Sequence, residues 1–202
     1  MARHKLPIFT ERTIAETRAD QIAHERKFSD PLERVSCHVQ CSACCHHAIH
    51  CTIPEGIVGY QQLARKGFWT PSLRKRLEDH ARQTWDLSTT VWHLSNIPCP
   101  LLERQRCSIY DARPFTCRVT FATGDPEQCH PHRVNNFSSI LPKRDALQGF
   151  FDAQGRLLKR HGQPVVAFAV SQAILVGAKI ATGEQDIETA LGALLRSVGD
   201  QA

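Results

Sequence analysis

The feature that most constrains this chain is a dense group of cysteines, Cys37-His-Val-Gln-Cys41-Ser-Ala-Cys44-Cys45. A two-residue gap, as between Cys41 and Cys44, lets a tight turn direct two sulfurs at one metal ion. Consecutive side chains diverge, so Cys44 and Cys45 both serve as ligands only where two ions or a cluster lie close by. Core packing does not explain four cysteines in nine residues, and the spacing predicts a metal centre without selecting the metal.

A second group of cysteines follows at wide intervals, at Cys99, Cys107, Cys117 and Cys129. These gaps predict ligands that come from separate loops. Prolines beside Cys99 and Arg113 stiffen the backbone there, which lowers the entropic cost of holding a ligand in place. Arg113 and Arg118 offset thiolate charge or donate hydrogen bonds to sulfur, unless they make incidental surface contacts.

The predicted metal ligands are therefore Cys37, Cys41, Cys44, Cys45, Cys99, Cys107, Cys117 and Cys129. Eight thiolates divide into two sets of four, enough for two tetrahedral Zn²⁺ ions or for one [4Fe-4S] cluster plus another site. The ligand types alone do not separate iron from zinc. The apolar neighbours Ile109, Tyr110 and Phe115 suit a shielded iron–sulfur cluster, which the sequence favours slightly, although they also suit an ordinary core.

The remaining cysteine and the nearby histidines have simpler interpretations. Cys51 is expected to be a buried thiol rather than a ligand. The histidines beside the clusters are assigned to the surface or to contacts around the ligands, since the cysteines suffice without them. They are His38, His46, His47, His50, His130 and His132.

Composition narrows the class of protein. The chain shows no apolar signal segment after its first residues, and nine cysteines cannot all pair, so we expect a cytoplasmic protein with reduced thiols. The net charge of +5 is spread along the chain, which indicates no nucleic-acid partner. The apolar run from Val165 to Ala178 is short for a membrane span and predicts a buried helix.

The chain divides into three expected sections, and all of them indicate a mostly α fold: a small irregular helical domain with cysteine-bearing loops and C-terminal helices. Residues 1–36 form a helical segment with Thr10 as N-cap, and 37–133 hold every cysteine. Within 37–133, a capping box at Thr52 and Glu55 and a Thr70-Pro71 start predict two helices between the cysteine groups. Residues 134–202 are expected to form a hairpin at 150–159, a helix opened by Pro164 and a last amphipathic helix from Ile187 to Val198.

Three stretches together resemble the bacterial CxxCxxCC proteins, the YkgJ-like cysteine-cluster family, which is described as zinc- or iron-chelating. They are Cys41-Ser-Ala-Cys44-Cys45, Pro98-Cys99-Pro100-Leu101 and Cys107-Ser-Ile-Tyr-Asp-Ala-Arg-Pro-Phe-Thr-Cys117. The family spacing would put a cysteine at position 38, where this chain has His38 with Cys37 beside it. The resemblance implies metal binding. Because flagellin lysine N-methylase is a relative, it also implies an S-adenosylmethionine-dependent methyltransferase as an alternative.

Several functions stay open on these residues. The chain is expected to hold a metal or cluster for redox chemistry, metal handling or the support of a protein partner, with zinc-bound structural modules as the alternative. Against the methyltransferase alternative, the sequence shows no glycine-rich loop after a strand that would bind the cofactor. The Cys37-x3-Cys41-x2-Cys44 spacing also matches radical S-adenosylmethionine enzymes, yet Ala43 replaces their usual aromatic residue and no strand–helix series is visible.

Overall fold

The computed structural model describes residues 8–25, 37, 41–122, 139–140, 144–160, 162–163, 166–190 and 192–193. Helices dominate these residues, and the strands form short two-stranded pairs, so the predicted mostly α fold is confirmed. Within the described ranges, no helix is both long and apolar enough to cross a membrane.

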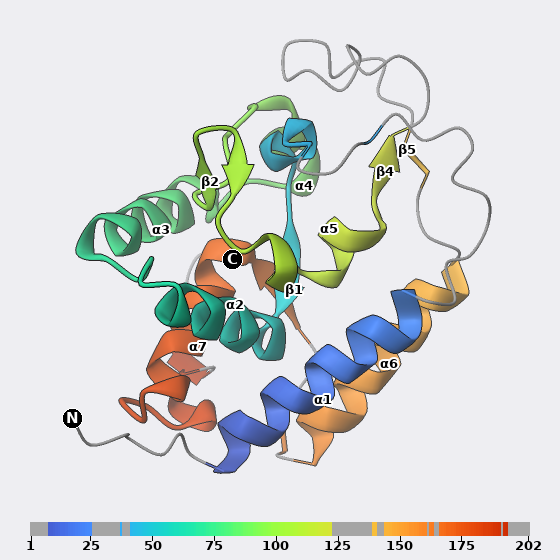
Figure 1. Cartoon of the computed structure of the whole chain (residues 1–202), viewed down its shortest axis with the longest axis vertical. Helices are drawn as coiled ribbons and strands as arrows, with labels where there is room; N and C mark the ends of the chain where they lie inside the picture. Colours follow the sequence, from blue (N-terminus) through green and yellow to red (C-terminus); the bar gives the residue numbers. More distant parts are fainter. Residues whose placement is uncertain are drawn as a thin grey trace.

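The centre of the core is the crossing of α2 (Ile53–Arg65) with α7 (Val170–Ala181), which lie against each other in Figure 1. Two glycines make this close approach possible. A Cβ on Gly177 would lie 2.6 Å from the backbone nitrogen of Ile57, and one on Gly56 would overlap the carbonyl of Ala173. The apolar face of α2, including Ile57 and Leu63, is fully buried there.

A second pair of helices, α1 (Ile8–Glu25) and α6 (Arg144–Lys159), lies side by side along one flank (Figure 1). The helices run antiparallel, since Gln154 Nε2 donates to Asp20 Oδ2 at 3.1 Å while Arg160 pairs with Glu16 one turn farther along. The predicted hairpin at 150–159 is wrong. Residues 150, 153, 154, 157 and 158 are buried at helical spacing, and Gly155 lies inside the helix instead of at a turn.

Capping side chains determine where the helices between the two cysteine groups begin. Thr52 and Glu55 form the predicted capping box at the start of α2, and Gly67 follows its end with a φ of 70°. The side chain of Thr70 caps α3 (Pro71–Thr84) by accepting from Leu73 N at 3.2 Å. A short α4 (Thr89–Leu94) follows. The predicted N-cap at Thr10 is wrong, because α1 begins at Ile8 and includes that residue.

The short strands join distant parts of the chain. Strand β1 (His50–Thr52) pairs antiparallel with β6 (Ala167–Ala169), placing His50 opposite Ala169. The helix predicted to open at Pro164 instead begins at Val170, because the residues before it are held in this strand pair. The remaining elements are η1 (Ala43–His46), β2 (Leu102–Glu103), β3 (Arg106–Cys107), η2 (Tyr110–Ala112), α5 (Phe115–Val119), β4 (Phe121–Ala122) and β5 (Ser139–Ile140).

The last predicted helix, from Ile187 to Val198, is seen in part. Residues 187–190 and 192–193 are helical, and the rest of that stretch lies outside the described residues.

Candidate metal centre

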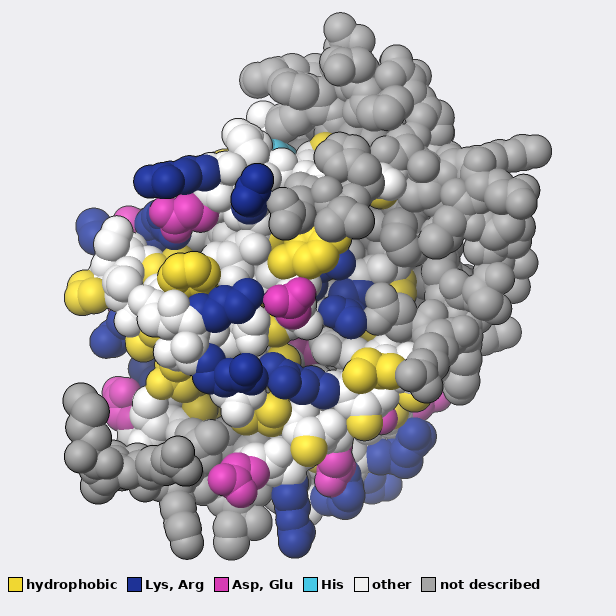
Figure 2. Space-filling model, in the orientation of Figure 1, with side chains coloured by type: hydrophobic (Ala, Val, Ile, Leu, Met, Phe, Trp, Pro, Cys, Tyr) yellow, Lys and Arg dark blue, Asp and Glu magenta, His cyan; other side chains and the backbone are white. Residues whose placement is uncertain are grey.

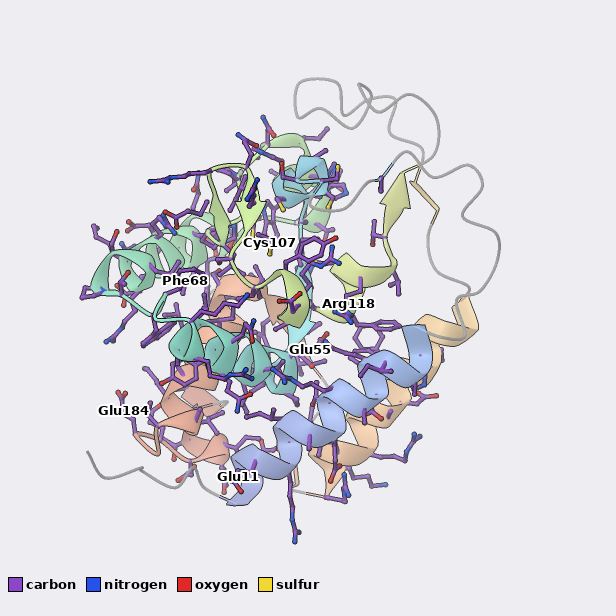
Figure 3. The ribbon with its side chains drawn as sticks, in the orientation of Figure 1. Glu11, Glu55, Phe68, Cys107, Arg118 and Glu184 are labelled. Atoms are coloured by element: carbon purple, nitrogen blue, oxygen red, sulfur yellow. The ribbon has the colours of Figure 1, made fainter. Side chains whose placement is uncertain are left out.

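Six cysteines from three stretches of the chain line one small cavity of about 30 Å³. They are Cys41, Cys44, Cys45, Cys99, Cys107 and Cys117. Arg113 and mainly apolar side chains complete the wall. Figure 3 shows Cys107 near the middle of the molecule with Glu55 in the adjoining region. The two cysteine groups, which the intervening helices separate by more than fifty residues, therefore meet in space.

The first stretch is held by a single turn of 3₁₀ helix, η1. Cys45 N donates to Ser42 O at 2.9 Å, and His47 N donates to Cys44 O at 3.1 Å. This tight backbone puts the adjacent residues Cys44 and Cys45 into the wall of the same cavity. The turn therefore brings both neighbours to one cavity, where both serve as ligands only if two ions or a cluster are bound.

The second stretch is tied directly to the first. Cys99 N donates to Cys45 O at 2.6 Å, and Leu102 N then donates to Cys99 O at 3.0 Å to form a turn. The β2–β3 hairpin follows, with Leu102 opposite Cys107. A main-chain hydrogen bond thus fixes the two cysteine loops relative to each other at the cavity.

The third stretch is α5, which carries Cys117 and starts beside a buried carboxylate. Glu55 Oε1 accepts from Phe115 N at 2.6 Å and from Gln21 Nε2 at 3.3 Å, while Oε2 accepts from Thr52 N at 2.9 Å. One side chain therefore caps α2, contacts α1 and orients the helix that holds Cys117. The sequence showed only the first of these three contacts.

Burial sets the electrostatics of the thiols. It raises the pKa of Cys99 to about 12 and raises the pKa of Cys107 and of Cys117 above the usual thiol value. In the adjacent pair, the hydrogen bond from Cys45 lowers the pKa of Cys44, and the same bond raises the pKa of Cys45. Several thiolates together in so apolar a wall need a bound cation to compensate their charge.

The two predicted arginines lie in different places. Arg113 lines the cavity, and its positive charge lowers the pKa of both Cys44 and Cys107, though in each case other effects are larger. Its guanidinium carbon lies 3.7 Å from the centroid of the Tyr110 ring, and its Nε donates to Tyr110 O at 2.9 Å. Arg118 is not among the described residues lining the cavity, and its Nη1 lies 3.4 Å from Asp111 O.

The donor set fits a thiophilic metal by its chemistry. Soft thiolate sulfur is the ligand that zinc and iron–sulfur clusters share, and the wall formed by Ile49, Leu101, Ile109 and Val170 excludes water from such a centre. The described side chains do not form a finished coordination shell, since no three of their His, Cys, Asp or Glu groups stand in the arrangement of a metal site.

A comparison with protein-family models identifies the family of this chain. The model of the CxxCxxCC family, described as "Putative zinc- or iron-chelating domain", matches residues 36–139, half of the chain. The chain belongs to the CxxCxxCC family. Comparison with curated proteins and comparison with solved structures each gave no match.

Two predicted ligands of this CxxCxxCC protein are absent from the described residues that line the cavity. Cys37 is half-buried and is not among the described lining residues, and Cys129 lies outside the described residues. His38, His130 and His132 also lie outside them. Cys51, expected to be a buried thiol, is 1% exposed in strand β1, and burial raises its pKa well above the usual value.

Sequence reasoning missed an aromatic and histidine cluster behind η1. The His47 and His93 rings lie 4.6 Å apart between centroids, and His50 and His80 lie 5.2 and 5.5 Å from Trp92. His93 Nδ1 accepts from Ala48 N at 3.0 Å. The four histidines and the tryptophan come from β1, α3, α4 and the turn after η1, so their meeting depends on the fold. The hydrogen bond from Ala48 N and the ring contact of His47 connect this cluster to the residues that follow η1.

Proposed function

We propose that this CxxCxxCC protein binds a polynuclear metal centre through its cavity cysteines, and that the centre is an iron–sulfur cluster used for redox chemistry or metal handling. The observation that supports it best is the convergence of six thiols on one apolar cavity. A single tetrahedral ion takes four ligands, so six thiols in one wall exceed what one ion needs.

The shielding of the cavity supports the iron–sulfur assignment. Cluster potentials depend on burial and on hydrogen bonds to the sulfurs. Both are present here, since the wall is largely apolar and backbone groups of Leu101 and Ile109 hydrogen-bond Cys99 and Cys107. Four of the six cysteines would hold a [4Fe-4S] core, and the core would supply one-electron chemistry. The remaining thiols and Arg113 would tune or protect it.

Zinc is the second candidate, and two observations favour it. Two tetrahedral Zn²⁺ ions that share two bridging thiolates need six cysteines in total, the number in the wall. The cavity is small, about 30 Å³, which suits single ions better than a core of eight atoms. A zinc centre would act as a structural module for a partner.

The experiment that separates these assignments is anaerobic purification followed by iron, zinc and acid-labile sulfide analysis and visible spectroscopy. A brown protein with stoichiometric iron and sulfide supports the cluster. A colourless protein with two zinc ions overturns the cluster and keeps the thiolate centre. If circular dichroism shows a folded protein and both metals are at trace level only, the proposal as a whole is overturned.

A matched pair of serine variants tests which cysteines are used. Cys117 lines the cavity and Cys51 is a buried thiol outside it, so Cys117→Ser and Cys51→Ser make the same chemical change in and out of the site. We expect Cys117→Ser to lose metal and Cys51→Ser to retain it. Equal metal content in the two variants contradicts the assignment of the cavity as the binding site.

A further inference from the structure

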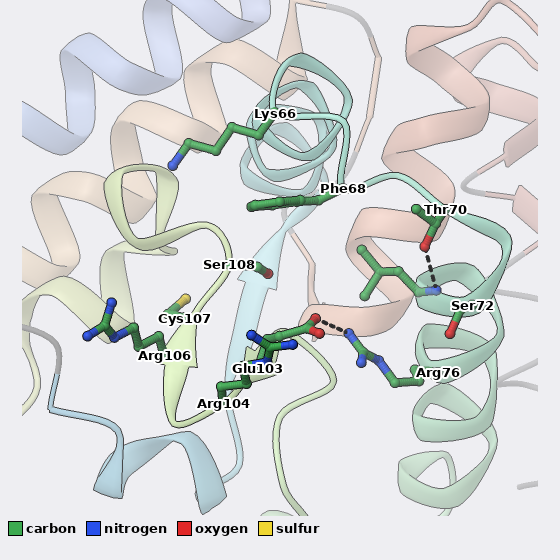
Figure 4. Close-up of a pocket in the computed structure, with 11 residues that line it drawn as sticks. Lys66, Phe68, Thr70, Ser72, Arg76, Glu103, Arg104, Arg106, Cys107 and Ser108 are labelled. Atoms are coloured by element: carbon green, nitrogen blue, oxygen red, sulfur yellow. Dashed lines mark hydrogen bonds and ion pairs between the residues drawn. The ribbon is translucent and has the colours of Figure 1, made fainter.

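A large pocket of about 630 Å³ lies on the other side of Cys107 from the cysteine cavity. It is formed by the α2–α3 loop, the first two turns of α3 and the β2–β3 hairpin, as Figure 4 shows. Its volume is in the range that holds a small organic ligand. Cys107 belongs to the wall of both spaces, so a molecule in the pocket would lie next to the cysteine centre.

The charge of the pocket is strongly biased. Four cationic side chains line it against one carboxylate: Lys66, Arg76, Arg104 and Arg106 against Glu103. Only Arg76 pairs with that carboxylate, at 3.1 Å, while Lys66 reaches outward to Asp111 at 3.4 Å. Figure 2 shows Lys and Arg side chains gathered over the hairpin and α2 on this face. The surplus of positive charge selects an anion.

The hairpin that presents two of these arginines is strained. Its two-residue turn has positive φ at both positions, 48° at Arg104 and 63° at Gln105. Asn-Gly or Gly-Gly is usual in such a turn, because residues with a Cβ adopt left-handed backbone at a cost. Strain at a ligand-facing arginine is the kind of feature that accompanies a binding site.

The pocket also contains an exposed aromatic ring. Phe68 is 48% exposed, and its ring extends from the α2–α3 loop toward Ser108, with Lys66 on one side and the Arg76–Glu103 pair on the other (Figure 4). A ring face left open among cations offers a stacking surface for a flat group. The hydroxyl of Ser108 adds a hydrogen-bonding group in the same wall.

From these observations we propose that the pocket binds a small organic phosphate that carries a planar ring, with the ring on Phe68 and the phosphate on Arg104 and Arg106. A phosphate monoester carries close to two negative charges at pH 7, which matches the cationic surplus better than one carboxylate does. The arginine forks bind its oxygens in pairs. The inference goes beyond the metal centre, rests on the pocket residues alone and holds for either metal.

The test uses adenosine monophosphate as the probe, titrated calorimetrically into the full chain as purified with its metal. Adenosine supplies a ring without phosphate, inorganic phosphate supplies charge without a ring, and benzoate supplies a ring with a carboxylate. We expect adenosine monophosphate to bind at least tenfold more tightly than each of the three, and to weaken as salt is raised. No binding up to millimolar concentration, or benzoate binding equally well, overturns the proposal.

Two substitutions test where the phosphate and the ring of the ligand bind. Arg104→Gly removes a charge and relieves the positive φ, so we expect about tenfold weaker binding in a protein that is no less stable to heat. Phe68→Ala is expected to weaken adenosine monophosphate about fivefold or more and to leave inorganic phosphate unchanged. Arg82→Ala, on the same helix as Arg76 but outside the pocket, is the control. Equal weakening by Arg82→Ala and Arg104→Gly shows general electrostatics and refutes the site.

Discussion

Replacing Glu55 by alanine is expected to destabilise the protein and to weaken its binding of metal, because this one carboxylate connects three helices. It is fully enclosed and accepts hydrogen bonds from Phe115 N at 2.6 Å, Thr52 N at 2.9 Å and Gln21 Nε2 at 3.3 Å. The alanine variant leaves those donors buried without an acceptor. The start of α5, and with it Cys117, loses its anchor.

The magnitude follows from the orphaned groups. Each buried N–H that loses its partner costs about 1–3 kcal/mol, so the two backbone donors alone cost about 2–6 kcal/mol. Part of this loss is offset because the variant no longer buries a carboxylate, and we expect a net loss of about 3 kcal/mol in the free energy of unfolding. That is a large fraction of the roughly 5–15 kcal/mol that stabilises a typical domain. Glu55→Gln keeps one acceptor oxygen but turns an N–H₂ toward Thr52 N, so it should lose about half as much.

The assay is urea unfolding followed by circular dichroism, together with metal analysis after dialysis. A loss of about 3 kcal/mol lowers the urea midpoint by about 1–2 M for an ordinary m-value. Glu78→Ala is the control, since Glu78 is an exposed residue of α3. A Glu55→Ala midpoint within error of that control would refute the reasoning.

The buried carboxyl of Glu55 also predicts how the stability of the protein depends on pH. Burial raises the pKa of Glu55 above its usual value, so the folded protein holds this proton more tightly than the unfolded chain does. Its contribution to stability is full below the unfolded pKa and declines as pH rises through the folded pKa. The stability difference between wild type and Glu55→Ala should therefore be larger at pH 4 than at pH 7. A purely steric role for the side chain predicts no such change.

Three further outcomes are expected. Gly177→Ala should cost about 2 kcal/mol or more by thermal unfolding, because the new Cβ would meet the backbone of α2 at 2.6 Å. Gly59→Ala should cost much less, since its Cβ would meet only side-chain atoms, of Ile174 at 3.3 Å and of Ile109 at 3.5 Å. Burial lowers the pKa of His80 to about 4, so its contribution to stability falls as pH drops from 6.5 toward 4, and His80→Gln should flatten the urea midpoint over that interval. Zn²⁺ added at pH 7 to metal-free protein should release about one proton per ligating thiol, measured with an indicator dye, and bind more tightly as pH rises, because burial raises the pKa of Cys99 and Cys117.

The features that sequence predicted well are those that depend on neighbouring residues. The capping box at Thr52 and Glu55 and the start of α3 at Pro71 follow from side chains within one helical turn. The error at 150–159 has the same local origin. Gly155 suggested a turn, but the burial of Phe150, Ala153 and Leu157 in packing against α1 outweighs the modest cost of one glycine inside a helix.

The sequence predicted which residue types form the candidate site, but not how those residues are arranged in space. Spacing indicated that the cysteines bind a metal, but the meeting of Cys41 with Cys117 depends on how α2 packs across α7 and on the hydrogen bond between Cys99 and Cys45. The pocket beside Phe68 gave no sequence signal, because its cations come from the α2–α3 loop, α3 and the hairpin. Only the residues Arg104-Gln105, unusual in a tight turn, marked it in retrospect.

The three cysteine-bearing stretches are held by different means, and this determines how each would respond to a change. Cys117 depends on the buried Glu55, and Cys45 on a main-chain bond to Cys99. Cys107 instead lies on a two-stranded hairpin whose turn is strained and which lines the pocket of about 630 Å³. Because a ligand that binds this hairpin must act on the residue bordering both spaces, Cys107 is the cysteine through which pocket occupancy would reach the metal. Loss of pocket binding should therefore alter the centre through Cys107 and leave the Glu55-anchored side unaffected.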